Sequence, residues 1–170
     1  DRRPKFHVYQ PTIGIISGIA WDHINVFPTF DFYVQQFETF AKMIPADGNY
    51  IYCADDSVLS EMSNKIEHPN KKGYSMLPHT IVNGTTILNT SEGDFPLQIF
   101  GKHNLANLNA AKLACNAVGI SDLQFYNAIT SFKGASNRLE LLYKDEQTAA
   151  YKDFAHSPSK LKATITAVRE

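Results

Sequence analysis

Residues 12–20 read TIGIISGIA, a continuous apolar run rich in isoleucine that contains two glycines. Such a run, without the alternation of a half-exposed strand, is typical of a strand buried on both faces, as in a parallel sheet covered by helices. It ends in Trp21-Asp22-His23, which places polar groups after the carboxyl end of the strand. Open α/β sheets bind their ligands at that edge. The stretch therefore predicts an α/β fold with a ligand-binding edge that begins near His23.

The segments that follow predict further alternation of helix and strand. Apolar side chains recur at helical spacing over residues 31–44, with Asp31 as the expected N-cap. Residues 48–54 (GNYIYCA) predict a second buried strand. The next three residues, Asp55-Asp56-Ser57, are expected to cap a short helix over residues 58–66. This order is typical of a parallel sheet with helices packed on it.

The middle of the chain predicts a small antiparallel sheet instead. Four short β-prone stretches cover residues 73–77, 80–82, 85–89 and 95–100. Asn83-Gly84 lies between two of them and is a strong signal for a tight hairpin turn. Two helices are expected after this sheet, over residues 104–118, ahead of Gly119, and over residues 121–132, with Ser121 as N-cap.

Gly134-Ala135-Ser136-Asn137 interrupts this pattern and is the predicted domain boundary. We therefore expect one domain over residues 1–133 and the start of another over residues 134–170. In the second, strand-like residues 139–143 and 149–154 precede a final helix. The predicted fold class is thus α/β: part of a nucleotide-binding domain, with a parallel sheet and a small antiparallel sheet, followed by the first βα unit of another domain.

Composition narrows the class of protein. The chain of 170 residues is 44% hydrophobic and 19% charged, which is ordinary for a folded globular protein. A formal net charge of −1 gives no bulk electrostatic preference for nucleic acid or for an acidic membrane. Cys53 and Cys115 stand in apolar contexts without metal-ligand spacing and are expected to be small buried hydrophobes of a reducing compartment. No apolar run approaches the ~20 residues that span a bilayer, so a cytoplasmic location is expected.

Four polar clusters could carry chemistry. They are Trp21-Asp22-His23 with Asn25; Gly101-Lys102-His103-Asn104 with Asn107 and Asn109; residues 134–138 (GASNR); and residues 152–158 (KDFAHSP). An Asp-His pair after a buried strand can supply a metal ligand or an acid–base group. Asparagines at a helix start can recognise a purine edge, and an arginine after a glycine hinge suits phosphate.

A purely structural interpretation of each cluster stays open as well. His23 can belong to a capped strand end, and Asn104 can simply cap its helix. Arg138 and His156 can be exposed surface residues, which is the common situation for isolated charged side chains. Taken one at a time, none of these clusters decides between the two interpretations.

The order and spacing of the clusters together resemble those of the Mur ligase family of cell-wall amino-acid ligases. The shared order is Asp-His after an isoleucine-rich strand, a two-aspartate turn at Asp55-Asp56, GKHN with a further asparagine, GxxxR, and DFAHSP. The resemblance covers the chain from about Arg3 to its end. The HNxxN and DFAHSP blocks are its most specific parts.

The resemblance implies a part of a three-domain, ATP-dependent ligase that forms an acyl phosphate from a carboxylate, which an amine then attacks. It implies that His23 helps to hold a second Mg²⁺ and acts near the transferred phosphate. It further implies adenine contacts by Asn104 and Asn107 with His103 beside them, phosphate contact and a catalytic role for Arg138, and contacts of Asp153 and His156 with the nucleotide when the domains close. The implied cofactors are ATP and Mg²⁺.

The chain also departs from the family pattern. A glycine-rich phosphate loop with Lys and Ser/Thr is absent from these residues, as is the family's acidic metal ligand. Both are expected upstream of Asp1, so the chain by itself is not expected to hydrolyse ATP. Phe37 stands where several members carry a carbamylated lysine, which favours the branch that acts on UDP-N-acetylmuramate. Ser157 stands where alanine-adding members usually carry a second histidine.

Two acceptors are considered within that branch. Two stretches are most similar to the sequences of members that use recycled L-alanyl-γ-D-glutamyl-meso-diaminopimelate. They are Phe154-Ala155-His156 and the start of the chain, Asp1–Phe6 (DRRPKF). The alternative acceptor is L-alanine, as in de novo peptidoglycan synthesis. The expected partners are therefore UDP-N-acetylmuramate and a peptide or amino acid, with no nucleic acid and no membrane. A hypothesis of another class is a non-catalytic module that lost the phosphate loop and acts through protein contacts.

Overall fold

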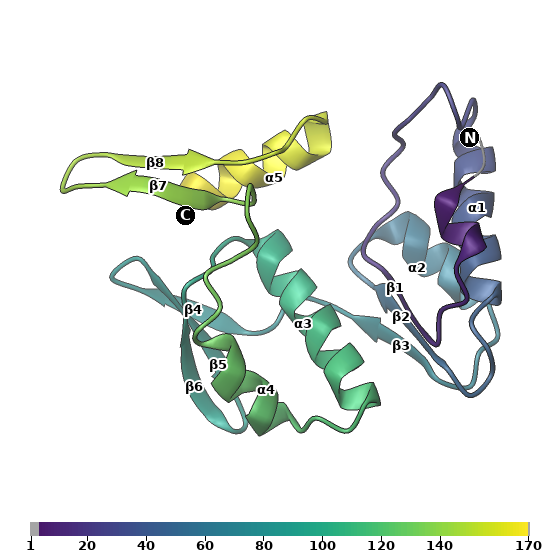
Figure 1. The fold of residues 1–170 in the computed structure, drawn as a ribbon, viewed down its shortest axis with the longest axis horizontal. Helices are drawn as coiled ribbons and strands as arrows, with labels where there is room; N and C mark the ends of the chain where they lie inside the picture. Colours follow the sequence, from purple (N-terminus) through teal and green to yellow (C-terminus); the bar gives the residue numbers. More distant parts are fainter. Residues whose placement is uncertain (1–3, 170) are drawn as a thin grey trace. The chain divides into compact units, whose positions relative to one another are not determined.

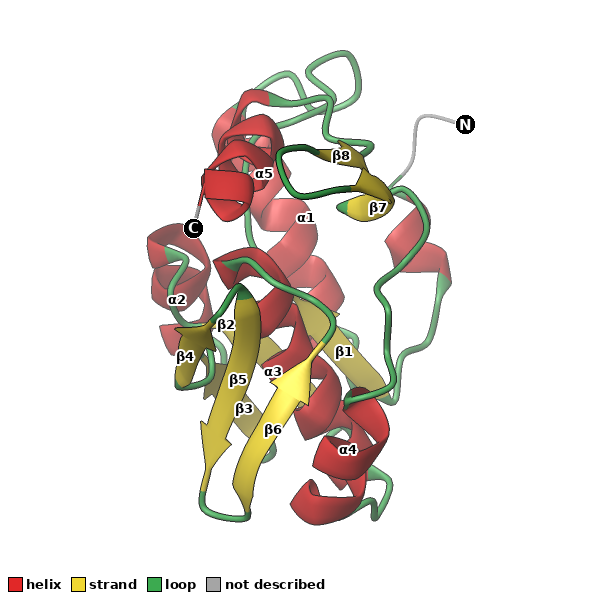
Figure 2. Ribbon diagram, turned by 90° about the vertical axis from the view of Figure 1, so that its left-hand side faces the viewer, coloured by secondary structure: helices red, strands yellow, loops and turns green. Residues whose placement is uncertain are grey.

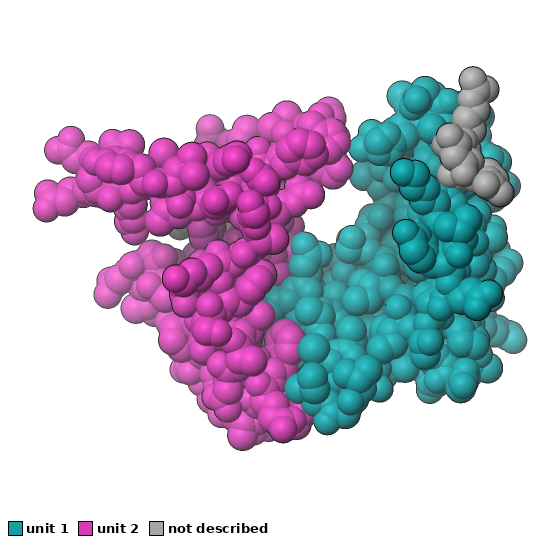
Figure 3. Space-filling view, viewed as in Figure 1, with its two compact units in different colours: residues 1–75, 106–120 teal, residues 76–105, 121–170 magenta. Residues whose placement is uncertain are grey.

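The computed structural model describes residues 4–169 and has an α/β fold (Figures 1 and 2). The chain divides into two compact units, coloured separately in Figure 3. Unit 1 consists of residues 1–75 and 106–120, and unit 2 of residues 76–105 and 121–170. Helix α3 (Lys102–Ala117) contributes residues to both units. The α/β class predicted from the sequence is confirmed.

Unit 1 is built on a parallel sheet with the strand order β1-β2-β3. The strands are β1 (Ile13–Ile16), β2 (Asn49–Cys53) and β3 (Lys71–Tyr74). Its helices are α1 (Phe30–Lys42), α2 (Ser57–Asn64), residues 106–117 of α3, and the short 3-10 helix η1 (Lys5–Val8). In the central strand, Tyr50 and Ile51 are fully buried, as a strand covered on both faces requires.

Helix α1 ends close to β1 because β1 carries a glycine there. A Cβ placed on Gly14 would come within 2.4 Å of Cδ1 of Ile44, just beyond the end of α1. Ile44 is itself buried in the unit 1 core, together with Ala41 of α1 and Leu59 of α2. The isoleucine-rich run therefore builds the core partly through side chains and partly through close backbone approach.

Unit 2 holds an antiparallel sheet with the strand order β4-β5-β6, seen face-on in Figure 2. The strands are β4 (His79–Val82), β5 (Thr85–Thr90) and β6 (Gly93–Leu97), and helix α4 (Asp122–Ile129) follows later in the chain. Tyr126 of α4 packs on Phe95 of β6, with ring centroids 5.2 Å apart. A second hairpin, β7 (Glu140–Lys144) with β8 (Ala149–Lys152), precedes helix α5 (Pro158–Arg169).

Two local predictions are confirmed in unit 2. Asn83 and Gly84 form the turn between β4 and β5 with φ values of 49° and 73°, the backbone shape that favours Asn-Gly in two-residue hairpins. Ser121 is the N-cap of α4 and forms a capping box with Gln124.

Three other predictions are wrong in detail. Only Ile13–Ile16 of the isoleucine-rich run is a strand, so His23 lies several residues beyond its end. Thr29, not Asp31, caps α1, because the Thr29 hydroxyl oxygen accepts a hydrogen bond from the Phe32 N–H at 3.2 Å. The stretch predicted as an antiparallel strand from Gly73 onward is β3, which pairs in parallel with β2.

The predicted domain boundary at Gly134 does not coincide with the division into units, because unit 2 takes residues from both sides of it. The assignment of residues 1–133 and 134–170 to two domains stays a prediction. Within residues 4–169, no helix has both the length and the apolar character to cross a membrane. Residues 1–3, part of the start that favoured the peptide acceptor, lie outside the described residues.

Candidate functional site

The structure brings three predicted site residues together in unit 2. His103 lies at the start of α3, Arg138 in the loop before β7, and Asp153 directly after β8. The charges of Asp153 and Arg138 both act on the pKa of His103, and the charge of Arg138 acts on the pKa of Asp153. A cation, an imidazole and a carboxylate from three separate segments therefore share one electrostatic environment.

Asp153 is held in place by hydrogen bonds. One carboxylate oxygen accepts from the Leu139 N–H at 2.9 Å, and the other accepts from the Ala155 N–H at 2.7 Å and the Thr164 hydroxyl at 3.2 Å. Partial burial acts to raise the pKa of Asp153, but these hydrogen bonds and the nearby Arg138 hold it below its ordinary value. The carboxylate is therefore negative at neutral pH and joins the loop before β7 to α5.

His103 is half-buried, and its environment favours the neutral imidazole. Burial lowers its pKa, Asp153 acts in the opposite direction, and Arg138 lowers the pKa further. At neutral pH the ring therefore carries one N–H donor and one acceptor nitrogen. That pattern suits hydrogen bonding to a heteroaromatic ring or a hydroxyl better than ion pairing with a phosphate.

The residues before α3 bring its first turn close to α5. Gly101 has φ of 87°, and a Cβ placed there would lie 2.5 Å from Cβ of Ala167 and 3.3 Å from Cε1 of His103. Asn104 does not cap the helix, since it lies within α3 and its side-chain amide donates to the Phe100 carbonyl at 2.8 Å. The interpretation of Asn104 as a simple cap is wrong. Asn107 follows one turn later and is exposed.

The loop before β7 has an unusual backbone. Gly134, Asn137 and Leu139 have φ values of 97°, 56° and 48°, and Leu139 is an apolar residue that rarely adopts this conformation. Hydrogen bonds hold the loop: Arg138 N–H donates to the Ala135 carbonyl at 3.1 Å, and Asn137 N–H donates to the Glu140 carboxylate at 2.9 Å. The Arg138 side chain is left exposed and available to an anion.

His156 lies apart from this cluster in burial and contacts. It is exposed, its Nδ1 lies 2.9 Å from the Phe154 carbonyl oxygen, and its ring packs edge-on against the Phe154 ring at 5.1 Å. The interpretation of His156 as an exposed surface residue describes its position. Its predicted contact with a nucleotide stays a prediction.

In unit 1, His23 lies in an exposed turn. It has φ of 55°, and its carbonyl accepts from the Val26 and Phe27 N–H groups at 2.8 and 3.0 Å. Its side chain is 65% exposed, and its Nε2 lies 4.0 Å from Oδ2 of Asp22. The turn therefore presents the imidazole to solvent beside a carboxylate.

The carboxyl edge of the parallel sheet carries polar groups that the predicted site omits. Asp56 accepts from the Ile19 N–H at 2.8 Å and from the Leu59 N–H at 2.9 Å, so it joins the segment after β1 to the start of α2. The Ser75 hydroxyl donates to Asp55 at 2.7 Å, and the Ser75 carbonyl accepts from the Asn109 amide at 2.7 Å. One signal was present in the sequence, namely polar residues within three positions of the ends of β2 and β3, at the edge where open α/β sheets bind their ligands.

The residues described fit a magnesium ion only in part. Among residues 4–169, no three His, Cys, Asp or Glu side chains converge on one point. Mg²⁺ prefers oxygen ligands and commonly takes most of them from water and substrate phosphates. Asp22 and His23 can supply a small part of such a set, and the role of His23 as a metal ligand stays a prediction.

Comparison with known proteins adds the family. The Mur ligase middle domain matches residues 3–115 of the chain. The chain belongs to the Mur ligase family. The L-alanine-adding Mur ligase of Arthrobacter sp. (strain FB24), UDP-N-acetylmuramate–L-alanine ligase, is 26% identical over 176 residues, which cover 97% of this chain and 38% of that protein. The UDP-N-acetylmuramate–L-alanyl-gamma-D-glutamyl-meso-2,6-diaminoheptandioate ligase of Escherichia coli (strain K12) is 28% identical over 178 residues, which cover 99% of this chain and 39% of that protein.

A solved Mur ligase shares the fold. The MurF ligase of Thermotoga maritima, crystallised in complex with ADP, matches with a TM-score of 0.73 at 14% identity, over 96% of this chain and 40% of that one. The chain spans only 38% and 39% of the length of the two curated Mur ligase relatives above. The family and fold are therefore established for the chain, and the activity of the whole protein is a separate question.

Proposed function

We propose that the protein carrying this chain is an ATP-dependent Mur ligase that joins UDP-N-acetylmuramate to a cell-wall peptide or amino acid through an acyl phosphate. The family match over residues 3–115 supports this proposal. The two curated relatives described above both use UDP-N-acetylmuramate, as their names state. The proposed compartment is the cytoplasm.

The observation that carries the proposal is the cluster of His103, Arg138 and Asp153 in unit 2. In the proposed site, neutral His103 lies beside adenine, which the amides of Asn104 and Asn107 contact. The exposed guanidinium of Arg138 binds the nucleotide phosphates by charge-assisted hydrogen bonds. The complex of the Thermotoga maritima MurF ligase with ADP supports a nucleotide as the ligand of this fold.

The hydrogen bonds and exposure of Asp153 and His156 bear on their proposed contacts with a nucleotide. Asp153 already accepts three internal hydrogen bonds, so its main proposed role is to position the loop that carries Arg138. His156 is exposed, and its contacts among residues 4–169 are with the exposed Phe154, so its ring is accessible to a nucleotide. Bound Mg²⁺ would offset charge on the transferred phosphoryl group, and His23 with Asp22 is the proposed protein contribution to that ion.

The proposed acceptor is the tripeptide L-alanyl-γ-D-glutamyl-meso-diaminopimelate, in peptidoglycan recycling. The sequence Phe154-Ala155-His156, which resembles that of tripeptide-adding members of the family, supports this acceptor. L-alanine is the alternative, and relatives named UDP-N-acetylmuramate–L-alanine ligase support it at identities of up to 30%, against 28% for the tripeptide-adding relative. A difference of this size does not discriminate between the two acceptors.

The test is phosphate release by the full-length protein with Mg-ATP and UDP-N-acetylmuramate, with either the tripeptide or L-alanine as acceptor. Turnover with the tripeptide alone supports the recycling role. Turnover with L-alanine alone assigns the protein to the first amino-acid addition of wall synthesis. If neither acceptor stimulates phosphate release above the rate without acceptor, the proposed ligase function is wrong.

A further inference from the structure

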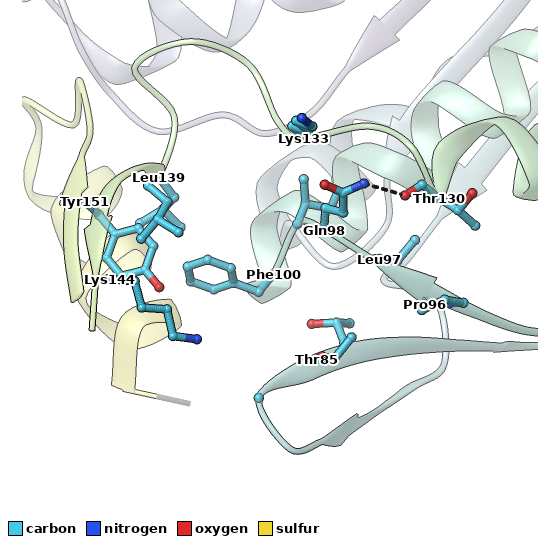
Figure 4. Close-up of a pocket in the computed structure, with 14 residues that line it drawn as sticks. Thr85, Pro96, Leu97, Gln98, Phe100, Thr130, Lys133, Leu139, Lys144 and Tyr151 are labelled. Carbon is cyan, nitrogen blue, oxygen red and sulfur yellow. Dashed lines mark hydrogen bonds between the residues drawn. The ribbon is translucent and has the colours of Figure 1, made fainter. Parts of the chain in front are cut away.

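We propose that a cavity in unit 2 binds a small anion that carries an apolar body, such as an arylphosphonate or an arylcarboxylate. The cavity has a volume of about 500 Å³ and lies between the antiparallel sheet and the β7–β8 hairpin (Figure 4). This volume is within the range of natural small-molecule sites. The lining includes none of the residues proposed above to bind a nucleotide.

The two walls of the cavity come from different elements. Thr85 and Leu97, from β5 and β6, belong to one wall, and Leu139, Lys144 and Tyr151 belong to the other. Figure 4 shows the ring of Phe100 between the two sets of side chains. The Phe100 and Tyr151 rings meet edge-on, with centroids 5.4 Å apart. Rigid aromatic side chains of this kind form good contact surfaces for an apolar ligand body.

The charged groups of the lining all have one sign. Lys133 and Lys144 line the cavity, and no acidic residue is among the described residues that do so. The nearest acid in sequence, Asp145, is occupied elsewhere: it accepts from the Tyr143 hydroxyl at 2.6 Å and from two N–H groups of the β7–β8 turn. Within residues 4–169, neither lysine has a carboxylate at ion-pair distance. The site therefore favours an anion.

The rest of the lining contains both apolar and polar residues. Leu97, Ile99 and Leu139 are buried and offer apolar surface. The Gln98 side-chain NH2 group donates to the Thr130 carbonyl at 3.0 Å, so this donor is already used. The charged groups of the lining, Lys133 and Lys144, are both cationic, which favours a ligand with an anionic head group over a neutral ligand such as a sugar.

The experiment uses the full-length protein with ¹³C-labelled leucine methyl groups and four probes. Phenylphosphonate and phenylacetate carry both parts of the proposed ligand, with a phosphorus-based and a carboxylate head group respectively. Benzyl alcohol carries the ring alone, and inorganic phosphate the anion alone. We expect the methyl signals of Leu97, Leu139 and Leu141 to shift with at least one of the first two probes, at an affinity about tenfold above that for the ring or the anion alone.

Lysine variants test the charge. Lys144→Gln and Lys133→Gln are expected to weaken binding of the aromatic anion about tenfold each, and to leave binding of benzyl alcohol unchanged. Lys162→Gln, an exposed lysine of α5 outside the cavity, is the matched control and is expected to change neither. Leucine signals that do not respond to any probe overturn the proposal. Equal losses in all three variants, or a preference for benzyl alcohol, overturn it as well.

A second measurement does not depend on the lysines. Because the ligand contacts both walls, bound phenylphosphonate or phenylacetate is expected to slow hydrogen exchange at the amides of β7 and β8. Exchange at the amides of α2 in unit 1, none of whose residues lines the cavity, is expected to stay constant. An unchanged exchange rate in β7 and β8 at saturating probe contradicts a ligand held between these elements.

Discussion

At the scale of single residues, Asp153 organises the largest share of the candidate site. Its carboxylate joins the backbone of Leu139, which has an unfavourable φ of 48°, to the loop after β8 and to α5. Backbone in a sparsely populated conformation persists only where surrounding contacts hold it. The strained loop that carries Arg138 therefore depends on Asp153.

Replacing this carboxylate by an amide should destabilise the protein. Asp153→Asn keeps the shape of the side chain but replaces one of its two acceptor oxygens by an NH2 group. Because the three donors now share both oxygens, at least one of them loses its acceptor, and we expect the free energy of unfolding to fall by about 2 kcal/mol. Urea unfolding of the full-length protein measures this change. Asp47→Asn, at an exposed aspartate of the turn before β2, is the control, with an expected change within about 0.5 kcal/mol. Equal effects of the two substitutions would contradict the role of Asp153.

His103 should produce a separate pH dependence. Its pKa in the folded state lies below the ordinary 6.5, mainly because of burial. In the window below 6.5 and above the folded pKa, the unfolded chain binds more protons, so stability falls as the pH is lowered through it. The depressed pKa of Asp153 has the same sign but acts below about 3.8. We therefore expect the free energy of unfolding, measured from pH 7 to pH 3, to show two regions that slope with pH. In His103→Gln the region just below pH 6.5 should lose its slope, whereas the region below about pH 3.8 should keep it. A slope that persists in this variant would rule out His103 as its source.

The sequence predicted the members of this cluster but not its geometry. His103, Arg138 and Asp153 were assigned to one ligand by resemblance alone, because nothing in local periodicity relates three segments so far apart in the chain. Two details of the cluster depend on the folded structure. Asn104 turns back to the Phe100 carbonyl instead of capping α3, and Asp153 uses its oxygens internally. Both depend on tertiary neighbours that a local pattern does not contain.

At the scale of secondary-structure elements, the approach of α5 to the start of α3 depends on Gly101. A side chain there would meet Cβ of Ala167 at 2.5 Å. The positive φ of 87° at Gly101 adds a backbone cost for any other residue. The glycine therefore determines how closely α5 can approach the first turn of α3.

A double-mutant cycle separates these two costs. Gly101→Ala is expected to destabilise the full-length protein by about 3 kcal/mol, from the overlap together with the backbone strain. Ala167→Gly alone should cost about 1 kcal/mol, as expected for glycine within a helix. In the double variant the overlap is relieved but the strain remains, so we expect a favourable coupling of about 1 kcal/mol or more in urea unfolding. Strict additivity would show that the two helices do not pack as described.

Elements with a local signal were predictable, and pairing between distant segments was not. The Asn83-Gly84 turn and the Ser121 cap are encoded by residues that act on their own neighbours. The strand Lys71–Tyr74 is predicted only in part, from Gly73 onward, because it reads KKGY, with two lysines and a glycine. It forms because β2 offers a parallel partner, and partner choice is a property of the whole sheet.

At the scale of the whole molecule, the division of the chain into units does not follow the order of the sequence. Residues 106–120 belong with the first 75 residues, whereas residues 76–105 belong with the last 50. Helix α3 is therefore the covalent element that both units share. Sequence patterns identified an α/β chain because periodicity reports burial locally, but they could not show that its units are discontinuous.

The proposed ligase activity assigns His23 a role in turnover rather than in folding, and its backbone offers a clean test. His23 has φ of 55°, a conformation that asparagine tolerates well. His23→Asn should therefore remove the imidazole without destabilising the turn. In the full-length protein with Mg-ATP, UDP-N-acetylmuramate and the acceptor that supports turnover, we expect kcat to fall about a hundredfold, because charge on the transferred phosphoryl group loses a stabilising contact. Binding of UDP-N-acetylmuramate, measured by calorimetry, should change less than about threefold, since a contact made in the transition state adds little to ground-state affinity.

Ile24→Ala, at the exposed neighbour in the same turn, controls for disturbance of the loop and should leave both quantities unchanged. Unaltered turnover in His23→Asn would remove His23 from the site, and equal losses in both variants would assign the effect to the turn instead of the imidazole.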